Sequence, residues 1–370
     1  MRSPLTLRSR DTSVTGQPIQ CEVIVPEIPP PDGRSSGYSL HRARHPILLP
    51  GLILLLAVTM TASLGLGTAG IAPDRLFAVV AGNGDRIAQA VLLDLRLPRT
   101  IVGVAVGGML GLAGAVLQGY LRNPLSEPSV LGTSNAAALG AVAAIYYGLA
   151  DWHILVLPGF AIMAGLLSLI ILFALAGRSE SPLTLILAGI AVGTLAGAGI
   201  SLSLNLSPNP FAAMEIMTWL LGSVEDRSME HVWIALPCIA IGIVLLLVDA
   251  RGLDALTLGE DGASALGIDL KRLRIRVLIG VAVGVGGAVA VAGAIGFVGL
   301  IVPHLVRPLT DRSPSAVLLP SMIAGAVLLT LADIAVRVIP TNSELKLGVV
   351  TAFLGVPVFL VHLLRERRLW

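Results

Sequence analysis

The chain has 370 residues, of which 55% are hydrophobic and 13% are charged. An ordinary soluble domain is about 25% charged, so this composition excludes a single water-soluble core as well as disordered, coiled-coil and collagen-like chains. A formal net charge of +2 provides no field that would favour nucleic acid as a partner. The apolar runs are continuous and close to the length of about 20 residues that crosses a bilayer as a helix, unlike the alternating strands of a membrane barrel. The composition therefore predicts an all-α, polytopic membrane protein.

Residues 1–45 form a polar, proline-containing segment with six arginines. We expect this segment to be a disordered cytoplasmic tail, and residues 46–370 to be the transmembrane domain. The first apolar run begins near Ile47, which is too deep in the chain and too long for the apolar region of a secretory signal. It is therefore predicted to be a retained span.

About ten apolar segments follow in chain order. The short eighth segment could also be a continuation of the seventh. An even number of spans places both termini on one side of the membrane. The predicted segments are 47–67, 97–120, 129–149, 153–176, 183–206, 231–249, 275–295, 296–308, 315–336 and 347–364.

The distribution of basic residues predicts the orientation. With both termini in the cytoplasm, 18 of the 25 Lys and Arg residues lie inside and 7 lie outside. Cytoplasmic loops carry an excess of Lys and Arg, so this arrangement is favoured. Between spans, residues 207–230 are expected to form a short helix at the outer mouth around Phe211–Leu221. Residues 250–274 form the longest cytoplasmic loop.

An internal repeat is visible in the glycine-rich spans. The sequence of Gly103–Gly107 recurs letter for letter at Gly280–Gly284. Other short sequence matches make spans 2–5 resemble spans 7–10. One span and one loop region separate the two copies, so the copies enter the membrane from opposite sides. Such inverted repeats are typical of transporters. The alternative is chance similarity between helices rich in Gly, Ala and Val.

The chain lacks several motifs that would indicate other functions. No P-loop sequence occurs, so no nucleotide site is expected in this chain. No His, Cys or carboxylate cluster has metal-ligand spacing, so no metal site is expected. An ion-coupled carrier needs an ionisable group inside the membrane, and the acid closest to that description is Asp333, near the end of a predicted span.

Several separate motifs occur along the chain in a fixed order. They are Arg96-Leu-Pro-Arg99, Gln118, Arg122–Pro128, Leu131–Asn135, Gly293–Gly299, Pro303-His304, Arg307, Gly348–Thr351 and Gly355–Pro357. Together these motifs resemble the FecCD family of ABC-importer permeases for ferric siderophores, haem and cobalamin. The resemblance covers roughly residues 46–365.

The resemblance implies a passive pathway subunit in a bacterial plasma (inner) membrane that moves a metal chelate into the cytoplasm, with a ferric siderophore as the first expectation. It implies a second permease chain in a homo- or heterodimer, two cytoplasmic ABC ATPase subunits and an extracytoplasmic substrate-binding protein. ATP and Mg²⁺ would be held by the ATPases, with no cofactor in this chain. Alternatives are an ABC permease for cobalamin, haem or free zinc or manganese ions, and an ion-coupled secondary carrier of the inverted-repeat type.

By the same resemblance, loop 250–274 would be the coupling segment, two short helices that dock on the ATPase; an ordinary solvated loop is the alternative. Short helices with small residues pack closely, and Glu260 would meet a basic groove of the partner. The coupling candidates are Leu258, Gly259, Glu260, Ala265, Leu266 and Gly267.

Three arginines are expected on the outer side, against the charge bias. In the resembling family, arginines at the positions of Arg96, Arg99 and Arg337 receive acidic residues of the binding protein, and guanidinium–carboxylate pairing gives orientation as well as attraction. The alternative for Arg337 is an i,i+4 pair with Asp333. The alternative for Arg96 and Arg99 is interfacial snorkelling.

Candidate residues of the translocation pathway and its gate are polar or helix-breaking residues in spans 3, 5 and 10 and in two turns. Each is also explained by ordinary turns or by hydrogen bonds between helices. A lone His304 is better explained as a hydrogen-bonded helix-end residue than as a proton relay. The pathway candidates are Asn123, Pro124, Ser134, Asn135, Ser181, Ser201, Asn205 and Thr351.

Overall fold

The computed structural model describes residues 47–67, 73–176, 182–339 and 345–366. The predicted tail at 1–45 and the gate candidate Ser181 lie outside the described residues. All regular structure in the described part of the chain is helical, as the composition predicted. The elements are α1 (Leu48–Gly65), α2 (Pro73–Val80), α3 (Arg86–Gln89), a π-helical segment (Ala90–Arg96), α4 (Leu97–Tyr120), a 3₁₀ turn (Pro128–Leu131), α5 (Thr133–Tyr146), α6 (Val156–Ala176), α7 (Pro182–Asn205), α8 (Pro210–Leu220), α9 (Met229–Val248), α10 (Ala250–Leu256), α11 (Glu260–Ala265), α12 (Leu270–Ala292), α13 (Val298–Val306), a 3₁₀ turn (Arg307–Leu309), α14 (Pro314–Val338) and α15 (Leu347–Glu366).

Each of the ten predicted apolar segments coincides with a helix. By length and composition, 7 helices in the described residues could cross a membrane. The other three segments form α5 with 14 residues, α13 with 9 residues and the apolar part of α15 at Leu347–Leu360. The chain is therefore a multi-pass helical protein, and a count of ten crossings stays a prediction.

One boundary differs from the sequence prediction, and one alternative that the sequence left open is decided. The helix expected to begin at residue 97 is continuous from Arg86 to Tyr120, because α3 and the π-helical segment lead directly into α4. The eighth segment is a separate helix, since the chain turns between α12 and α13. There Gly293 and Phe297 have positive φ values of 70° and 68°.

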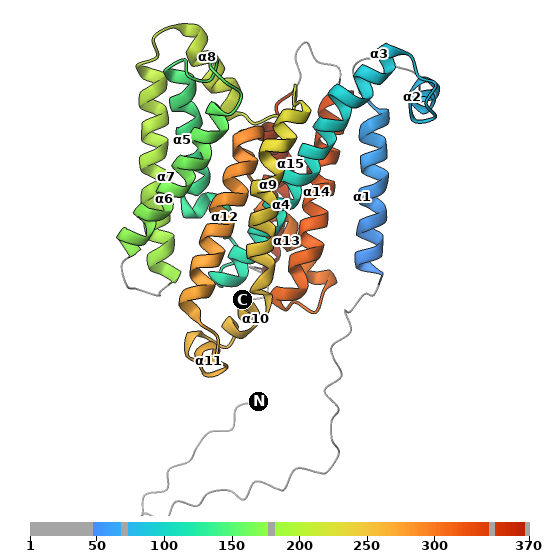
Figure 1. The fold of residues 1–370 in the computed structure, drawn as a ribbon. Helices are drawn as coiled ribbons and strands as arrows, with labels where there is room; N and C mark the ends of the chain where they lie inside the picture. The colour runs from blue at the N-terminus through green and yellow to red at the C-terminus, as the bar shows by residue number, and fades with distance from the viewer. Residues whose placement is uncertain (1–46, 68–72, 177–181, 340–344, 367–370) are drawn as a thin grey trace, which may run out of the picture. The chain divides into compact units, whose positions relative to one another are not determined.

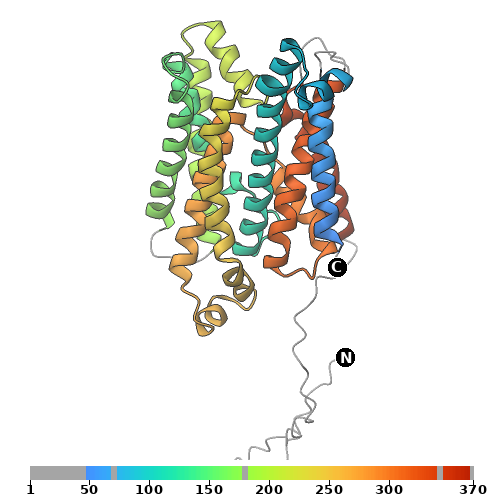
Figure 2. The same ribbon diagram turned by 45° about the vertical axis from the view of Figure 1, so that its right-hand side comes forward.

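The helices stand side by side as a bundle (Figures 1 and 2). The short helices α10 and α11 project from one end of the bundle, and α2, α3 and α8 lie at the opposite end. The spans containing α4 and α12 are the most enclosed by other parts of the chain, whereas α1 is the least enclosed. Lipid or partner chains therefore have to cover most of α1 and much of α6, α7 and α9.

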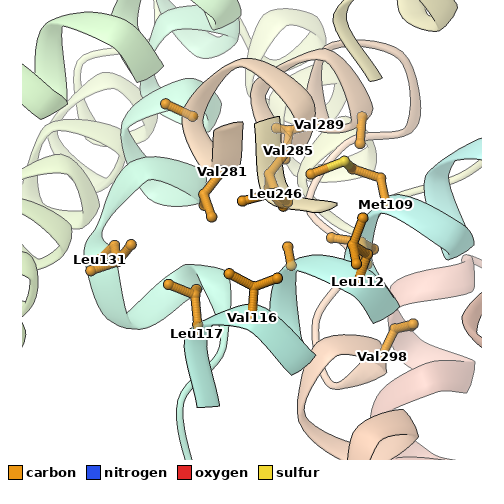
Figure 3. Close-up of a cluster of buried hydrophobic side chains, with 14 of the residues drawn as sticks. Met109, Leu112, Val116, Leu117, Leu131, Leu246, Val281, Val285, Val289 and Val298 are labelled. Atoms are coloured by element: carbon orange, nitrogen blue, oxygen red, sulfur yellow. The ribbon is translucent and has the colours of Figure 1, made fainter. Parts of the chain in front are cut away.

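Small side chains bring the central helices into close contact. Met109, Leu112 and Val116 of α4 pack with Val281 and Val285 of α12 in the buried core shown in Figure 3. A Cβ atom at Gly114 would overlap the backbone of Gly299 in α13, and one at Gly107 would overlap the backbone of Gly325 in α14. These glycines are needed because no hydrophobic effect drives helices together inside a bilayer.

The packing partners agree with the internal repeat. α4 packs against α13 and α14, and α12 packs in the corresponding way against α5 and α6. Likewise α5 contacts α6 and α7, while α13 contacts α14 and α15. Two related four-helix units packed against each other produce this exchange of partners, and the inversion of one unit stays a prediction.

Candidate functional site

The loop predicted to couple the chain to an ATPase forms two short helices, α10 and α11. Glycine is required at both ends of α11, since Gly259 and Gly267 have φ values of 91° and 83°. The amide of Ile268 bonds the carbonyl of Ala263 and the amide of Gly267 bonds that of Ser264, which closes α11 with a glycine C-cap. Tight turns thus hold the pair of helices in one compact projection.

The side chains at this projection are apolar and exposed. Leu258 is 68% exposed and Leu266 is 63% exposed, and Ala265 is exposed beside them. Glu260 instead lies half-buried at the edge of a small cavity lined by Arg122, Lys271 and Arg274 of the same chain. The residues that this end offers to a partner are therefore the two leucines rather than the carboxylate.

The projection is fastened to two long helices. The Asp254 carboxylate in α10 accepts a hydrogen bond from the amide of Ser315 at the start of α14, at 2.9 Å. Asp249, just before α10, forms an ion pair with Arg276 of α12 at 2.7 Å. A displacement of α10 would consequently move the ends of α12 and α14.

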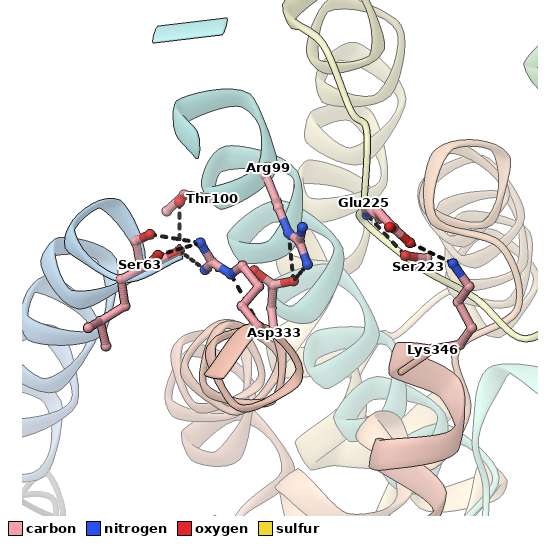
Figure 4. Close-up of polar contacts among 9 residues, drawn as sticks. Ser63, Arg99, Thr100, Ser223, Glu225, Asp333 and Lys346 are labelled. Carbon is pink, nitrogen blue, oxygen red and sulfur yellow. Dashed lines mark hydrogen bonds and ion pairs between the residues drawn. The ribbon is translucent and has the colours of Figure 1, made fainter. Parts of the chain in front are cut away.

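At the opposite end, Asp333 of α14 binds two guanidinium groups (Figure 4). Arg99 of α4 lies 2.8 Å from one carboxylate oxygen and Arg337 lies 2.8 Å from the other. Arg337 also donates to the carbonyls of Ser63 and Leu66 at the end of α1. This cluster joins α1, α4 and α14 at the end of the bundle away from α10 and α11. The charge distribution predicts that this end faces outward, and it is called the outer end below.

Two of the three arginines predicted to dock a binding protein are buried within this chain, and the docking role itself stays a prediction. Arg96 is 5% exposed and Arg337 is 6% exposed. Arg96 donates two hydrogen bonds of 2.9 Å to the carbonyls of Leu64 and Gly65, the last residues of α1. These carbonyls have no helical partner and favour a cation, so the arginines bind the end of α1. The i,i+4 pair with Asp333 that sequence spacing offered as the alternative is confirmed for Arg337.

The pathway candidates in α5 lie beside the middle of α7, whereas those in α7 lie further along that helix. The Asn135 side chain is exposed, and its amide nitrogen lies 3.4 Å from the carbonyl oxygen of Gly193 in α7. Ser134 is half-buried beside it. Near the outer end of α7, Ser201 bonds the Gly197 carbonyl within its own helix, and Asn205 is exposed.

Two other pathway candidates make local contacts. Thr351 is buried near the start of α15 and donates to the carbonyl of Gly348. Asn123 accepts a hydrogen bond from the amide of Leu125, which shapes the turn around the exposed Pro124. These contacts agree with the ordinary turn and helix bonding that the sequence also allowed, and a pathway role stays a prediction.

The motif residues Gln118 and Arg307 bind each other. The amide nitrogen of Gln118 in α4 lies 3.3 Å from the carbonyls of Gly299 and Leu300 in α13, and its oxygen accepts from Arg307 at 2.9 Å. The ring of His304 lies 3.0 Å from the carbonyl of Leu300. The interpretation of His304 as a hydrogen-bonded helix residue fits this geometry.

A cavity of about 450 Å³ at the outer end was not predicted from the sequence. It is lined by α8, by the loop between α8 and α9, by the end of α12 and by Lys346. Burial raises the pKa of the Glu215 carboxyl at its edge, and nearby Asp151 raises it further. Burial lowers the pKa of Arg227, while Asp226 and Glu225 raise it. The predicted short helix at the outer mouth, now α8, was the one available signal for this cavity.

No group of three or more His, Cys, Asp or Glu side chains that could hold a metal ion occurs within the residues that the structure describes.

Comparison with known proteins identifies the relatives of this chain. Residues 54–365 match the FecCD transport family. An uncharacterised ABC transporter permease protein, YvrB of Bacillus subtilis, is 36% identical over 78% of this chain and 82% of its own length. The vitamin B12 import permease BtuC of Klebsiella pneumoniae is 37% identical over 86% of this chain and 93% of its own. A metal-chelate type ABC transporter, solved in an inward-facing conformation, superimposes with a TM-score of 0.78 at 32% identity, covering 87% of this chain and all of the other.

Proposed function

We propose, from the premise that the chain belongs to the FecCD transport family of ABC-importer permeases, that it carries a bulky metal chelate into the cytoplasm. The chain is a multi-pass membrane protein that works with partner ATPase and permease chains. In the proposed assembly two permease chains enclose the pathway, two ATPases dock in the cytoplasm, and a binding protein delivers the cargo at the outer face. The chain would then lie in a bacterial inner membrane, with both termini in the cytoplasm.

The cargo is the finer part of the proposal. Relatives from several organisms are vitamin B12 or cobalamin permeases, and one solved relative is of metal-chelate type. Cobalamin is therefore the first chelate to test, and the ferric siderophore expected from the sequence motifs is the second. Both are metal ions enclosed by a large organic ligand, so a pathway lined for one such ligand suits the other class as well.

The observation that carries the proposal is the projection formed by α10 and α11. A pair of exposed leucines on a rigid turn, at the end of a membrane protein away from its apolar surface, fits an apolar pocket on another protein. In this proposal Leu258, Ala265 and Leu266 contact the ATPase, and Gly259 and Gly267 set the turns. Glu260, which lines a small cavity beside basic residues of its own chain, is a further candidate for the ATPase contact.

The proposed coupling passes from α10 into the membrane. The hydrogen bond of Asp254 transmits the movement of α10 to α14, and the Asp249–Arg276 ion pair transmits the same movement to α12. Because α14 and α12 pack against α4 and α6, their displacement shifts one half of the repeat against the other. Asn123, Pro124, Ser134, Asn135, Ser181, Ser201, Asn205 and Thr351 are proposed to lie along the route that opens.

The predicted docking of the binding protein at Arg96, Arg99 and Arg337 has to take account of the contacts that these side chains already make. Asp333 already satisfies Arg99 and Arg337, so an incoming acidic side chain has to share or displace that carboxylate. Arg99 retains the greater exposure of the two side chains. We therefore propose Arg99 as the docking arginine, with Arg96 and Arg337 holding α1 beneath it.

Asp333 also bears on the alternative of an ion-coupled carrier. Such a carrier needs a carboxylate that gains and loses a proton in the membrane. Asp333 is already paired with two guanidinium groups, each 2.8 Å from one of its oxygens. The buried acid of α14 is thus a structural ion-pair partner, which favours energy supplied by ATP on a partner chain.

The proposal is tested by uptake in cells that lack this chain. Cyanocobalamin carrying radioactive cobalt and siderophores carrying radioactive iron are supplied separately, under iron limitation and without it. We expect one of these signals to be lost and to return with the intact chain, but not with a variant in which Leu258 and Leu266 are both changed to Asp. Unchanged uptake of every chelate in a strain shown to have no second permease would contradict the proposal.

A further inference from the structure

The cavity at the outer end is bounded by segments that are bonded to one another. The amide of Ser223 donates to the carbonyl of Ala292, at 2.8 Å, and that of Gly348 donates to the carbonyl of Leu221, at 3.0 Å. The Lys346 ammonium lies 2.6 Å from the Glu225 carboxylate (Figure 4). These contacts join α8, the loop after it, the end of α12 and the start of α15. The space of about 450 Å³ among them is therefore a built site rather than a gap between loose loops.

One wall of this cavity is apolar and faces open space. Phe211 and Met214 lie one helical turn apart on α8, and both side chains are exposed, by 80% and 60%. Trp219 of the same helix also lines the cavity. Aromatic and thioether side chains bind the hydrocarbon parts of organic ligands without demanding one geometry.

The charges around the cavity do not balance. Lys346 is paired with Glu225. Arg227 is held between the His231 ring, at 3.1 Å, and the fields of Asp226 and Glu225. Among the residues that the structure describes, the cavity lining has three carboxylates, Glu215, Glu225 and Asp226, against the two cations Arg227 and Lys346. Asp151 adds a further negative charge near Glu215. The opening therefore has a negative potential, which repels multiply anionic ligands.

We propose that this cavity contacts the cargo at the outer mouth, and that Glu215 and Asp226 make it favour neutral or cationic metal chelates over anionic ones. The inference rests on the proposed transport of a metal chelate and names the charge class of that chelate. The organic shell would lie against Phe211, Met214 and Trp219, and discrimination would come from repulsion of a chelate with surplus negative charge.

The first experiment measures the potential of the cavity without any cargo. Thr218 lines the cavity and Met217, its exposed neighbour on α8, does not. Thr218→Cys and, as the matched control, Met217→Cys are made in a chain whose Cys21 and Cys238 are replaced by Ser and Ala. Each reacts with a cationic trimethylammonium and an anionic sulfonate methanethiosulfonate reagent, and each rate is divided by the rate with free mercaptoethanol.

We expect the cation-to-anion rate ratio to be at least about fivefold higher for Thr218→Cys than for Met217→Cys, because the cavity lining has a surplus of carboxylates. Adding Glu215→Gln and Asp226→Asn should bring the ratio to within about twofold of the control. Asp94→Asn, which removes an exposed carboxylate of the π-helical segment, should leave the ratio as it was. Equal ratios at the two positions, or no response to Glu215→Gln and Asp226→Asn, would overturn the inference.

The second experiment measures selection of cargo by the complete transporter. Cyanocobalamin is compared with its anionic monocarboxylate, and cationic ferrioxamine B with its anionic N-succinyl derivative. For the cargo that is carried, we expect Glu215→Gln with Asp226→Asn to raise uptake of the anionic form relative to its partner by about threefold or more. Unchanged selection with normal uptake would overturn the inference and leave the proposed function standing. Failure of the unaltered transporter to carry any of these chelates would overturn the proposed function itself.

Discussion

Asp254 of α10 caps the start of α14 by accepting a hydrogen bond from the amide of Ser315 across 2.9 Å. The two residues are 61 positions apart in the chain, and their bond joins the exposed projection to a helix of 25 residues that runs through the bundle. At the far end of α14, Asp333 holds Arg99 of α4 and Arg337. One rigid helix thus connects the proposed ATPase contact with the outer end of the molecule.

Replacing Asp254 with Ala is expected to uncouple transport from hydrolysis. Loss of one helix-terminus hydrogen bond costs about 1 kcal/mol, so the chain should still fold and bind its partners. Uptake per ATP hydrolysed should fall severalfold in proteoliposomes, since α14 no longer follows α10. Asp94→Ala is the control, because Asp94 is exposed at the opposite end. An unchanged ratio of uptake to hydrolysis would show that this bond transmits nothing.

Removing Asp333 is expected to destabilise the protein strongly. The carboxylate is buried and satisfies two guanidinium groups. Asp333→Ala leaves these charges unpaired, at a cost of about 3–5 kcal/mol, and the thermal midpoint in detergent should fall accordingly. Replacing Arg99 and Arg337 with Met together with Asp333→Ala should recover part of that loss. A drop as large in the triple variant as in the single one would contradict this account.

The contact between Gly114 and Gly299 predicts sensitivity to a single methyl group. Gly114→Ala places a Cβ atom against the backbone of α13, and overpacking of this kind costs about 1–3 kcal/mol. Gly197→Ala in α7 meets no atom within 4 Å, so it should be neutral or slightly stabilising. Thermal unfolding in one detergent compares the two variants, and equal midpoints would contradict the packing described here.

The outer cavity is expected to lose negative charge on mild acidification. Glu215 has a pKa raised by burial and by Asp151. Its carboxylate therefore gains a proton at a higher pH than a free glutamate, whose ordinary value is 4.5. As the pH decreases, the ratio of the reaction rates of Thr218→Cys with the cationic and the anionic reagent should fall. The same ratio should change less when Glu215→Gln is also present. Parallel profiles in the two backgrounds would contradict the assignment to Glu215.

The sequence predicted the helices well, because continuous apolar runs of bilayer length have few other structures available. The predicted segment at 183–206 forms α7 at Pro182–Asn205, and the short helix around Phe211–Leu221 forms α8 at Pro210–Leu220. The extension of α4 back to Arg86 was missed, since its polar residues resemble a loop when hydropathy alone is considered.

The sites were harder to predict because they depend on contacts distant in the sequence. Arg96 looked like a surface residue, but carbonyls of Leu64 and Gly65 at the end of another helix bind it. The pair of Asp333 and Arg337 lies within one helix, so its i,i+4 spacing was enough to offer the pair as the alternative to docking. The outer cavity joins α8, α12 and Lys346, and no local pattern indicates such a combination.

The most direct test of the central claim is chelate uptake into proteoliposomes that contain this chain, its permease partner and the ATPase, with the binding protein and radiolabelled cargo on the outer side. With ATP enclosed, the unaltered transporter should accumulate the chelate, and Leu258→Asp with Leu266→Asp should abolish that accumulation while the chain remains folded. Accumulation without ATP that is driven by a proton gradient, or full ATP-driven uptake by this leucine variant, would contradict the account.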